Sequence, residues 1–251
     1  MRLALISDIH GNPIALDAVL ADIAAQGGVD ETWVVGDLAA LGYDPVGVLD
    51  RLHDVPNAHF LRGNTDRYTV TGDRPPPSLE DARRDPALQA RYDEVARSFA
   101  WTRSYLLASG WLDWLAALTL ERRLTLPDGA RLLAVHASPG RDDGMGIQPT
   151  MSDAEILALV QDADADLVVV AHTHRALDRT VGGIRVINLG SLSNPATADV
   201  RAAYALVDAD SHGHVVQSRR VEYDWQAVVA AIRAVHHPAA DFLIQHWRRA
   251  Q

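Results

Sequence analysis

The sequence of 251 residues contains neither cysteine nor lysine. Without cysteine, disulfide frameworks and thiolate metal sites are both excluded, so any metal ion must be held by nitrogen and oxygen atoms. Without lysine, the positively charged side chains are all Arg. We attribute this to base composition in the source genome rather than to phosphate recognition. The formal net charge is −10. An acidic surface opposes the phosphate neutralisation on which binding of long nucleic acids depends, so stable binding of duplex nucleic acid is not expected.

Long apolar segments are also missing. The first apolar run, Leu3 to Ile6, is too short for the core of a signal peptide and leads into polar residues. No later segment approaches the length of a membrane span. We therefore expect a cytoplasmic protein that has no membrane partner. Hydrophobic residues make up 48% of the chain and charged residues 22%, which is typical of globular proteins. A chain of this length buries enough surface to fold without disulfides or structural metal ions.

Short apolar runs that end in polar residues alternate with helical patterns along the chain. After the run Leu3 to Ile6, Asn12 is a predicted N-cap, Pro13 occupies the first helical position, and Gly27 ends the helix. Ser152 opens a later helix with a capping-box pattern. The same unit recurs, and the further predicted strands are residues 32–35, 58–61, 131–135, 167–171 and 184–187. Strands joined through helices predict an α/β fold.

The rhythm changes near the end of the chain. Residues 202–207 and 215–223 flank a polar segment, 208–213, and this pattern predicts a β-hairpin. An amphipathic helix is predicted from about Asp224. Strands joined through helices, together with a hairpin, indicate mixed sheets with helices outside, in a single domain that spans residues 1–251.

Residues 67–120 interrupt this pattern. The segment begins near three consecutive prolines, Pro75 to Pro77, and continues with helical stretches rich in Trp and Tyr. We interpret it as a helical lid inserted beside the site. Ordinary helical packing at the edge of the sheet is the alternative that the pattern leaves open.

Side chains suited to metal binding follow the predicted strands. In α/β sheets, ligands bind at the edge formed by the carboxyl ends of the strands. Each residue alone is a weak signal, because a strand-end Asp is usually a cap or turn former and a single His is usually a core residue. The candidate ligands are Asp8, His10, Asp37, Asn64, His136, His172 and His174. Chance would have to place a ligand at every strand end in this series, so a metal site is the better interpretation.

The series resembles the calcineurin-like metallophosphoesterases, and within them the small bacterial and archaeal phosphodiesterase-like branch. The resemblance covers residues 1 to about 195 and rests on Asp8-Ile9-His10, Gly36-Asp37, Gly63-Asn64-Thr65-Asp66, His136 and His172-Thr173-His174. It implies a four-layer α-β-β-α sandwich with two mixed β-sheets. It also implies two divalent metal ions in a binuclear centre.

The resemblance assigns roles to these residues. Asp8, His10 and His174 would hold one metal, and Asn64, His136 and His172 the other, with Asp37 as the bridge. Asp37, Asn64, Asp66 and His172 are the predicted catalytic residues, and a hydroxide that bridges the two ions would attack the phosphorus in line. Manganese is the first expectation for the metal, and Fe, Ni, Co or Zn would suit the same ligands.

Two positions depart from the family pattern. Ala171 replaces the Gly that usually precedes His-Thr-His, which the backbone tolerates if this position does not need a positive φ. Thr65 replaces the His that often follows Gly-Asn and acts as an acid toward the leaving group. General-acid catalysis is therefore not expected from this position, and the phosphodiesterase-like branch commonly lacks that His as well.

Three further sites concern the substrate. Arg62 could grip a phosphate oxygen or pair with a carboxylate. Asn12 could contact phosphate or only cap its helix, and capping is the stronger interpretation. The loop from Ser138 to Gly146 is expected to be mobile and to line the mouth of the site.

The predicted function is metal-dependent hydrolysis of phosphodiesters or reactive phosphomonoesters, with a small-molecule phosphate ester as the partner. A phosphomonoesterase for a nucleotide or a phosphoprotein is the enzymatic alternative. A non-catalytic scaffold of the same fold is the alternative from a different class, and the intact ligand series argues against it. Whether the chain forms a homo-oligomer is left open.

Overall fold

The computed structural model describes residues 1–247 and contains two five-stranded sheets with the strand orders β10-β9-β1-β2-β3 and β4-β5-β6-β8-β7. The strands of the first sheet are β1 (Arg2–Ile6), β2 (Glu31–Val35), β3 (Ala58–Leu61), β9 (Ala202–Asp210) and β10 (Gly213–Val221). Those of the second are β4 (Glu121–Thr125), β5 (Arg131–Val135), β6 (Leu167–Val170), β7 (Leu177–Val181) and β8 (Ile184–Asn188).

Both sheets are mixed. The strands β1, β2 and β3 are parallel, and the β9–β10 hairpin joins them through an antiparallel pairing of β9 with β1. In the second sheet β5, β6 and β8 are parallel, and β4 and β7 are antiparallel strands at its two edges. Parallel strands have their carboxyl ends at one edge, so each sheet presents a row of strand ends from which loops can carry a site.

The helices begin where the sequence supplies caps. Asn12, Asp44, Ser152 and Asp224 each accept a backbone N–H at a helix start, and a Pro occupies the first position after Asn12 and after Asp44. The helices are α1 (Pro13–Ala25), α2 (Pro45–His53), α3 (Asn64–Thr71), α4 (Leu79–Arg84), the 3₁₀ turn η1 (Pro86–Leu88), α5 (Gln89–Ser109), α6 (Trp111–Ala116), α7 (Asp153–Val160), α8 (Trp225–Ala234) and α9 (Ala240–Ile244).

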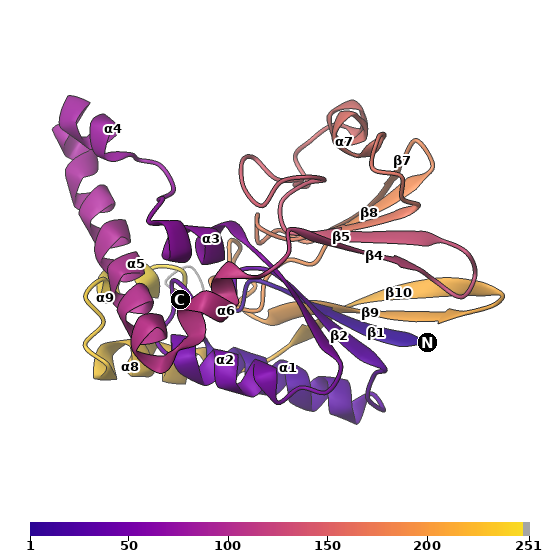
Figure 1. Ribbon diagram of the computed structural model, residues 1–251, viewed down its shortest axis with the longest axis horizontal. Helices are drawn as coiled ribbons and strands as arrows, with labels where there is room; N and C mark the ends of the chain where they lie inside the picture. Colours follow the sequence, from indigo (N-terminus) through magenta and orange to yellow (C-terminus); the bar gives the residue numbers. More distant parts are fainter. Residues whose placement is uncertain (248–251) are drawn as a thin grey trace.

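Alternating side chains of the central strands build separate cores on the two faces of each sheet. In β1, Leu3 and Leu5 face the other sheet, whereas Ala4 and Ile6 pack against the outer helices. In Figure 1, α1 and α2 run along the outer face of the first sheet and α7 lies beyond the second. The order helix, sheet, sheet, helix is the predicted four-layer sandwich, and the fold class is confirmed.

Several predicted boundaries were wrong. The hairpin strands extend into the segment 208–213, so that the turn between them contains only Ser211 and His212. The prediction missed β4 and β7, which are polar edge strands with alternating or partial burial. The strand predicted over residues 167–171 ends at Val170. None of the helices within residues 1–247 is long and apolar enough to cross a membrane.

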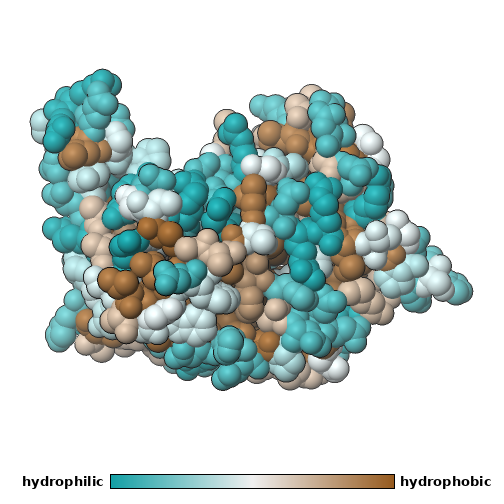
Figure 2. Space-filling model, viewed as in Figure 1, coloured by the Kyte–Doolittle hydropathy of each residue, from teal (hydrophilic) through white to brown (hydrophobic). Residues whose placement is uncertain are grey.

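The segment predicted as a lid contains the end of α3 and all of α4, η1, α5 and α6. In Figure 1, α4 and the first part of α5 form an arm that projects away from the sandwich. Figure 2 shows that the surface is hollowed between this arm and the half that carries α7, and that the visible surface of the arm is mainly hydrophilic. A lid function for the arm stays a prediction.

Candidate metal centre

The predicted ligands converge because they follow strands whose carboxyl ends meet between the two sheets. Each of them lies within four residues of the end of its strand, either in a loop or, for Asn64, at the first position of α3. From the first sheet come Asp8 and His10 after β1, Asp37 after β2 and Asn64 after β3, and from the second come His136 after β5 and His172 and His174 after β6.

Five of the seven candidate ligands have left-handed backbone conformations, which are uncommon for residues other than glycine. The φ angles are 54° at Asp8, 50° at His10, 57° at Asp37, 67° at His172 and 56° at His174. Such conformations cost about 1–3 kcal/mol each and persist only where the surrounding structure enforces them. The chain is therefore bent at these positions in order to direct side chains toward one place.

Two glycines provide the space that this convergence needs. A Cβ atom at Gly63 would lie 2.1 Å from Oδ1 of Asp37, and one at Gly36 would lie 2.6 Å from Nδ1 of His136. Gly36 also has a φ of 84°. Glycine is therefore needed before Asp37 and before Asn64, because the loops after β2 and β3 approach each other closely there.

His10 and His174 both point one ring nitrogen into the cluster. Nδ1 of His10 lies 2.9 Å from the carbonyl oxygen of Ala40, and Nδ1 of His174 lies 2.7 Å from that of Asn194. A carbonyl oxygen accepts only, so in the neutral ring each Nδ1 carries the proton and each Nε2 presents a lone pair. These two Nε2 atoms lie 3.1 Å apart.

The other two histidines are oriented in the same way. His136 directs Nδ1 to the carbonyl oxygen of Val35 at 2.7 Å, and His172 directs Nε2 to that of Gly144 at 2.9 Å. Their remaining nitrogens face Oδ1 of Asn64, at 3.2 Å from His136 and 2.9 Å from His172. Both nitrogens of each ring thus face an oxygen that only accepts, whereas a neutral imidazole has a single N–H to donate. If that proton lies on the nitrogen beside the backbone carbonyl, the other nitrogen presents a lone pair to the oxygen of Asn64.

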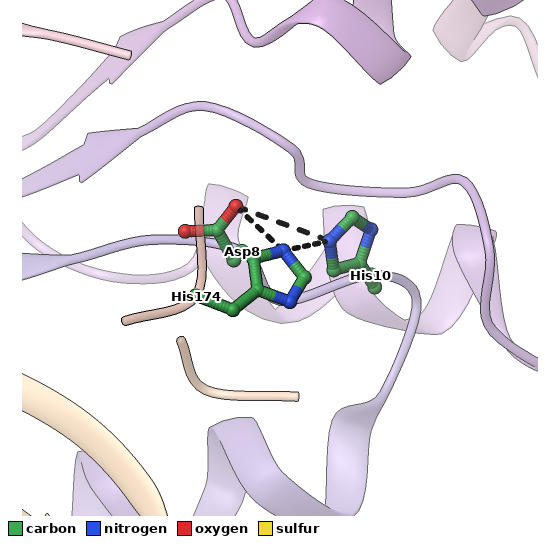
Figure 3. A group of neighbouring side chains, drawn as sticks. All are labelled: Asp8, His10 and His174. Atoms are coloured by element: carbon green, nitrogen blue, oxygen red, sulfur yellow. Dashed lines mark hydrogen bonds and ion pairs between the residues drawn. The ribbon is translucent and has the colours of Figure 1, made fainter. Parts of the chain in front are cut away.

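Asp8 belongs to both groups of donors. Its side chain is fully buried, and within residues 1–247 neither carboxylate oxygen has a hydrogen-bond partner. Oδ1 lies 3.2 Å from Nε2 of His174 and 3.9 Å from Nε2 of both His10 and His136. Figure 3 shows the group formed by Asp8, His10 and His174, in which the three polar ends point toward one another.

Asp37 lies between the two groups. Its Oδ1 accepts a hydrogen bond of 2.9 Å from the backbone N–H of Thr65. Its Oδ2 lies 3.7 Å from Nε2 of His10 and 3.4 Å from Nε2 of His136, one histidine from each predicted metal. Asp8, Asp37 and His136 form a second group whose ligand atoms lie within 4.8 Å of one another. The bridging role of Asp37 stays a prediction.

The electrostatics of the cluster require a cation or bound protons. Burial by itself raises the pKa of Asp37, but the charges of His136 and His10 and a hydrogen bond to His136 lower it well below its ordinary value. Conversely, burial lowers the pKa of His136, but Asp37 and Asp8 raise it to about 10. Two buried carboxylates thus hold positive charge beside them. Metal ions compete with protons for such sites, because the ligands bind metal in their deprotonated forms.

These observations test whether the residues fit metal ions. The cluster offers imidazole nitrogens, carboxylate oxygens and an amide oxygen, and in neutral rings the carbonyl contacts direct lone pairs inward. Both oxygens of Asp8 lack a hydrogen-bond partner within the described residues, which leaves them available to a cation. Nitrogen and oxygen donors suit divalent transition metals. The residues therefore fit divalent metal ions.

Asp66, for which a catalytic role stays a prediction, accepts hydrogen bonds from three backbone N–H groups. Its Oδ2 accepts from the N–H groups of Asp37 and Gly63 at 2.8 and 2.9 Å, and its Oδ1 accepts from that of Leu38 at 3.0 Å. Burial and the charge of Asp37 raise the pKa of Asp66 to about 7, against the opposing effect of these donors. The carboxylate joins the loop after β2 to the start of α3.

The two predicted substrate residues also have structural contacts. Asn12 caps α1, since Oδ1 accepts from the N–H of Ala15 at 3.2 Å, and its Nδ2 donates to Oγ of Ser193 at 3.1 Å. Arg62 donates from Nε to Asp142 at 2.8 Å. This bond anchors the loop at Ser138 to Gly146, for which the sequence predicted mobility.

The carbonyl groups that orient the histidines were not predicted. Asn194 and Gly144 act through backbone oxygens, and no side-chain pattern in the sequence marks such a role. Asn194 has a φ of 51°, which belongs to the same set of strained positions as the ligands. The departure at Ala171 has no consequence for the backbone, because Ala171 is not among the residues with positive φ.

A cleft of about 780 Å³ adjoins the cluster. It is lined by the loop after β6, by residues 194–196, by Arg91 near the start of α5, and by the residues that follow α9. A volume of this size is typical of sites for small-molecule ligands. The candidate centre thus opens into a space that can hold the rest of a substrate.

Comparisons with known proteins agree with this geometry. A family model described as the calcineurin-like phosphoesterase superfamily domain matches residues 1–212. The uncharacterized protein MJ0912 of Methanocaldococcus jannaschii is 26% identical over 239 residues, which cover 88% of each chain. The crystal structure of hypothetical protein PH1004 from Pyrococcus horikoshii OT3 has a TM-score of 0.82 at 21% identity and covers 100% of this chain and 98% of its own. That of a metallophosphoesterase from Sphaerobacter thermophilus has a TM-score of 0.72 at 25% identity and covers 100% of this chain and 99% of its own.

Proposed function

Because the chain belongs to the calcineurin-like phosphoesterase superfamily, we propose that it is a two-metal phosphodiesterase that also hydrolyses reactive phosphomonoesters. One observation carries the proposal. Two groups of candidate ligand atoms, one at His10 and His174 and one at His136 and His172, face the buried carboxylates of Asp8 and Asp37, and both oxygens of Asp8 lack a hydrogen-bond partner within residues 1–247. Such an arrangement is stable only around positive charge.

We assign Asp8, His10 and His174 to one metal ion, and Asn64, His136 and His172 to the other, with Asp37 in contact with both. Two divalent cations, when bound there, neutralise charge on the phosphoryl oxygens and activate water near neutral pH. Manganese is our first choice, and the donor set also suits Fe, Co, Ni and Zn.

The protein's own contribution is orientation. The carbonyl oxygens of Ala40, Val35, Gly144 and Asn194 fix which nitrogen of each histidine faces the centre. Outer contacts of this kind typically contribute 10–100-fold to metal affinity or activity, as an order of magnitude. Asp66 is not among the assigned ligands but accepts from the backbone N–H groups of Asp37 and Gly63, and so holds together the two loops that carry Asp37 and Asn64.

Thr65 supports a preference for substrates with good leaving groups. Its backbone N–H donates to Asp37, and its hydroxyl is buried without a partner within residues 1–247. A hydroxyl does not release a proton near neutral pH, so the leaving oxygen must depart with little help from this position. The adjoining cleft supports diesters, because a diester carries a second substituent that needs room.

Arg62 retains donors for a phosphate oxygen. Only its Nε is engaged, by Asp142, and no hydrogen bond of its terminal nitrogens is found within residues 1–247. Asp142 would thus orient the guanidinium while leaving two nitrogens available. We propose that Arg62 contacts the substrate in this way, whereas Asn12 supports α1.

A substrate screen tests the proposal. The chelator-stripped protein would be assayed with Mn, Ni, Co, Zn and Mg in turn, on bis-p-nitrophenyl phosphate and on p-nitrophenyl phosphate. We expect metal-dependent hydrolysis that favours the diester. Asp54→Asn, at an exposed aspartate that directly follows the last turn of α2, is the control for Asp8→Asn. A preference for the monoester would identify a phosphomonoesterase instead, and no hydrolysis with any metal would overturn the proposal.

A further inference from the structure

The cleft beside the candidate centre is lined by positively charged side chains, whereas the chain as a whole is acidic. The formal net charge is −10, from 33 carboxylates and 23 arginines. Nevertheless, the described residues that line the cleft include two arginines, Arg91 and Arg175, and no Asp or Glu. The part of the cleft lined by described residues thus carries no acidic side chain that would repel a negatively charged substrate.

Arg175 is positioned to act on a substrate. It directly follows the candidate ligand His174, its side chain is exposed, and it lines the cleft. Within residues 1–247 it makes no ion pair or hydrogen bond. Other arginines close to the centre are paired, since Arg62 and Arg67 both donate to Asp142. In a chain with an excess of carboxylates, an unpaired Arg in a cleft has donors available for a ligand.

Arg91 enters the same cleft from the helical insertion. Its guanidinium carbon lies 4.0 Å from the ring centroid of Phe242 in α9. Stacking on an aromatic face orients the guanidinium and leaves its in-plane N–H groups available. Glu94, one turn further along α5, is the acidic group that acts on Arg91 through its charge, and it does not line the cleft.

We propose that this cleft binds a second phosphate group of the substrate, beside the scissile phosphodiester. The proposal rests on the proposed phosphoesterase function for the position of the scissile phosphate. Planar guanidinium groups recognise phosphate through paired N–H donors, which makes two arginines suited to a dianion. The preferred substrate class is then a nucleotide or short oligonucleotide that carries a terminal phosphate.

Two substrates with the same scissile bond test this inference. One is the p-nitrophenyl ester of thymidine 5′-phosphate with a free 3′-hydroxyl, and the other carries a 3′-phosphate. With Mn²⁺ supplied, we expect kcat/KM to be about 10–100-fold higher for the 3′-phosphorylated ester, as charge-assisted hydrogen bonds to two arginines would give. The difference should appear mainly in KM, because the reacting atoms are identical.

Matched variants locate the effect. Arg175→Gln should reduce the preference to about threefold or less, and Arg91→Gln should reduce it in part, since each loses a charge-assisted contact. Neither should change hydrolysis of the ester without the 3′-phosphate more than about twofold, because that ester lacks the phosphate group that the two arginines would contact. Arg97→Gln is the control, because Arg97 is exposed on the same helix and does not line the cleft. It should leave the preference unchanged.

Binding provides a readout that does not depend on turnover. Calorimetry would compare thymidine 3′,5′-bisphosphate with thymidine 5′-monophosphate, with and without Mn²⁺, on the wild type and on Arg175→Gln. Tighter binding of the bisphosphate that is lost in the variant supports the inference, even if neither ester is hydrolysed and the proposed function fails. Hydrolysis of both esters with equal kcat/KM, or a preference that survives both Arg→Gln changes, would overturn the inference and leave the phosphoesterase function intact.

Discussion

The Nε2 atoms of His10 and His174 lie 3.1 Å apart, while Nδ1 of each ring is bonded to a backbone carbonyl oxygen. Two neutral imidazoles held in this way direct lone pairs at each other. Asp8 adds a carboxylate oxygen 3.2 Å from the same atom of His174. The three side chains belong together only when a cation or a proton lies among them, and this condition leads to the first prediction.

Chelation should lower the melting temperature modestly. Bound metal stabilises the native state by mass action, and its removal leaves Asp8 and Asp37 close together without a bound cation. At a metal concentration of 100 times Kd the loss is about 2.7 kcal/mol. Differential scanning fluorimetry with and without chelator measures it.

The control for this measurement is Asp8→Asn, which removes a ligand of one of the two metal ions. The variant should show a smaller difference than the wild type between chelated and metal-supplied samples. An unchanged melting temperature of the wild type after complete chelation would argue against a preformed metal centre.

Asp37→Asn should lower turnover at least about 100-fold, because a direct ligand matters more than the outer contacts that contribute 10–100-fold. Asn retains the oxygen that accepts from Thr65, so the loop should keep its path. Circular dichroism and metal analysis, together with the diester assay, separate the effects. Near wild-type activity with two bound metals would show that the bridging assignment is wrong.

The sequence could indicate that the candidate ligands lie near one another, because a sheet edge is encoded locally. A short apolar run followed by Asp, His or Asn is visible without any knowledge of the fold, and parallel strands then bring their ends together. His136 and Val35 show where this reasoning stops. The carbonyl oxygen that orients His136 lies 101 residues away along the chain and belongs to the other sheet. Only the packing of the two sheets creates this contact.

Polar edge strands were missed for a related reason. Three of the five residues of β4, Glu121, Arg122 and Arg123, are charged, and none of the five residues is buried. Its extended conformation comes from antiparallel pairing with β5 rather than from an apolar pattern of its own. The contacts of Asp66 with three backbone N–H groups were not predicted either, because two of them depend on the path of the loop after β2.

His237 should make stability fall on the acid side. Burial lowers its pKa to about 4 from an ordinary value of 6.5. Its Nδ1 accepts from the N–H of Ala239 at 3.1 Å, and its Nε2 is buried without a partner within residues 1–247. Between pH 6.5 and 4, His237 is protonated in the unfolded chain but stays neutral in the folded chain. Stability at neutral pH is therefore lost as the pH falls through this window, by about 1–3 kcal/mol.

Urea unfolding at several pH values between 7 and 4 measures this loss, and His237→Asn is its matched variant. Asn can accept from the same N–H group and does not titrate. The variant should lose less stability than the wild type over the window. Parallel curves for the two proteins would mean that His237 does not contribute to the pH dependence.

Thr65 gives the last prediction, which concerns the leaving group. The wild type should cleave nitrophenyl esters readily and alkyl esters slowly, because the buried Thr65 hydroxyl cannot supply a proton near neutral pH. Thr65→His would introduce a group that can, and general-acid catalysis typically contributes about 10²–10⁴-fold. Three backbone N–H groups already occupy most of the acceptor sites of Asp66, so it would orient the new imidazole weakly, and we expect a gain for alkyl esters at the low end of this range. Rates measured against leaving-group pKa should fall less steeply in Thr65→His than in the wild type, whereas Thr65→Asn, which is polar but not acidic, should keep the wild-type slope. A shallow wild-type slope that neither substitution changes would mean that another acid already protonates the leaving group.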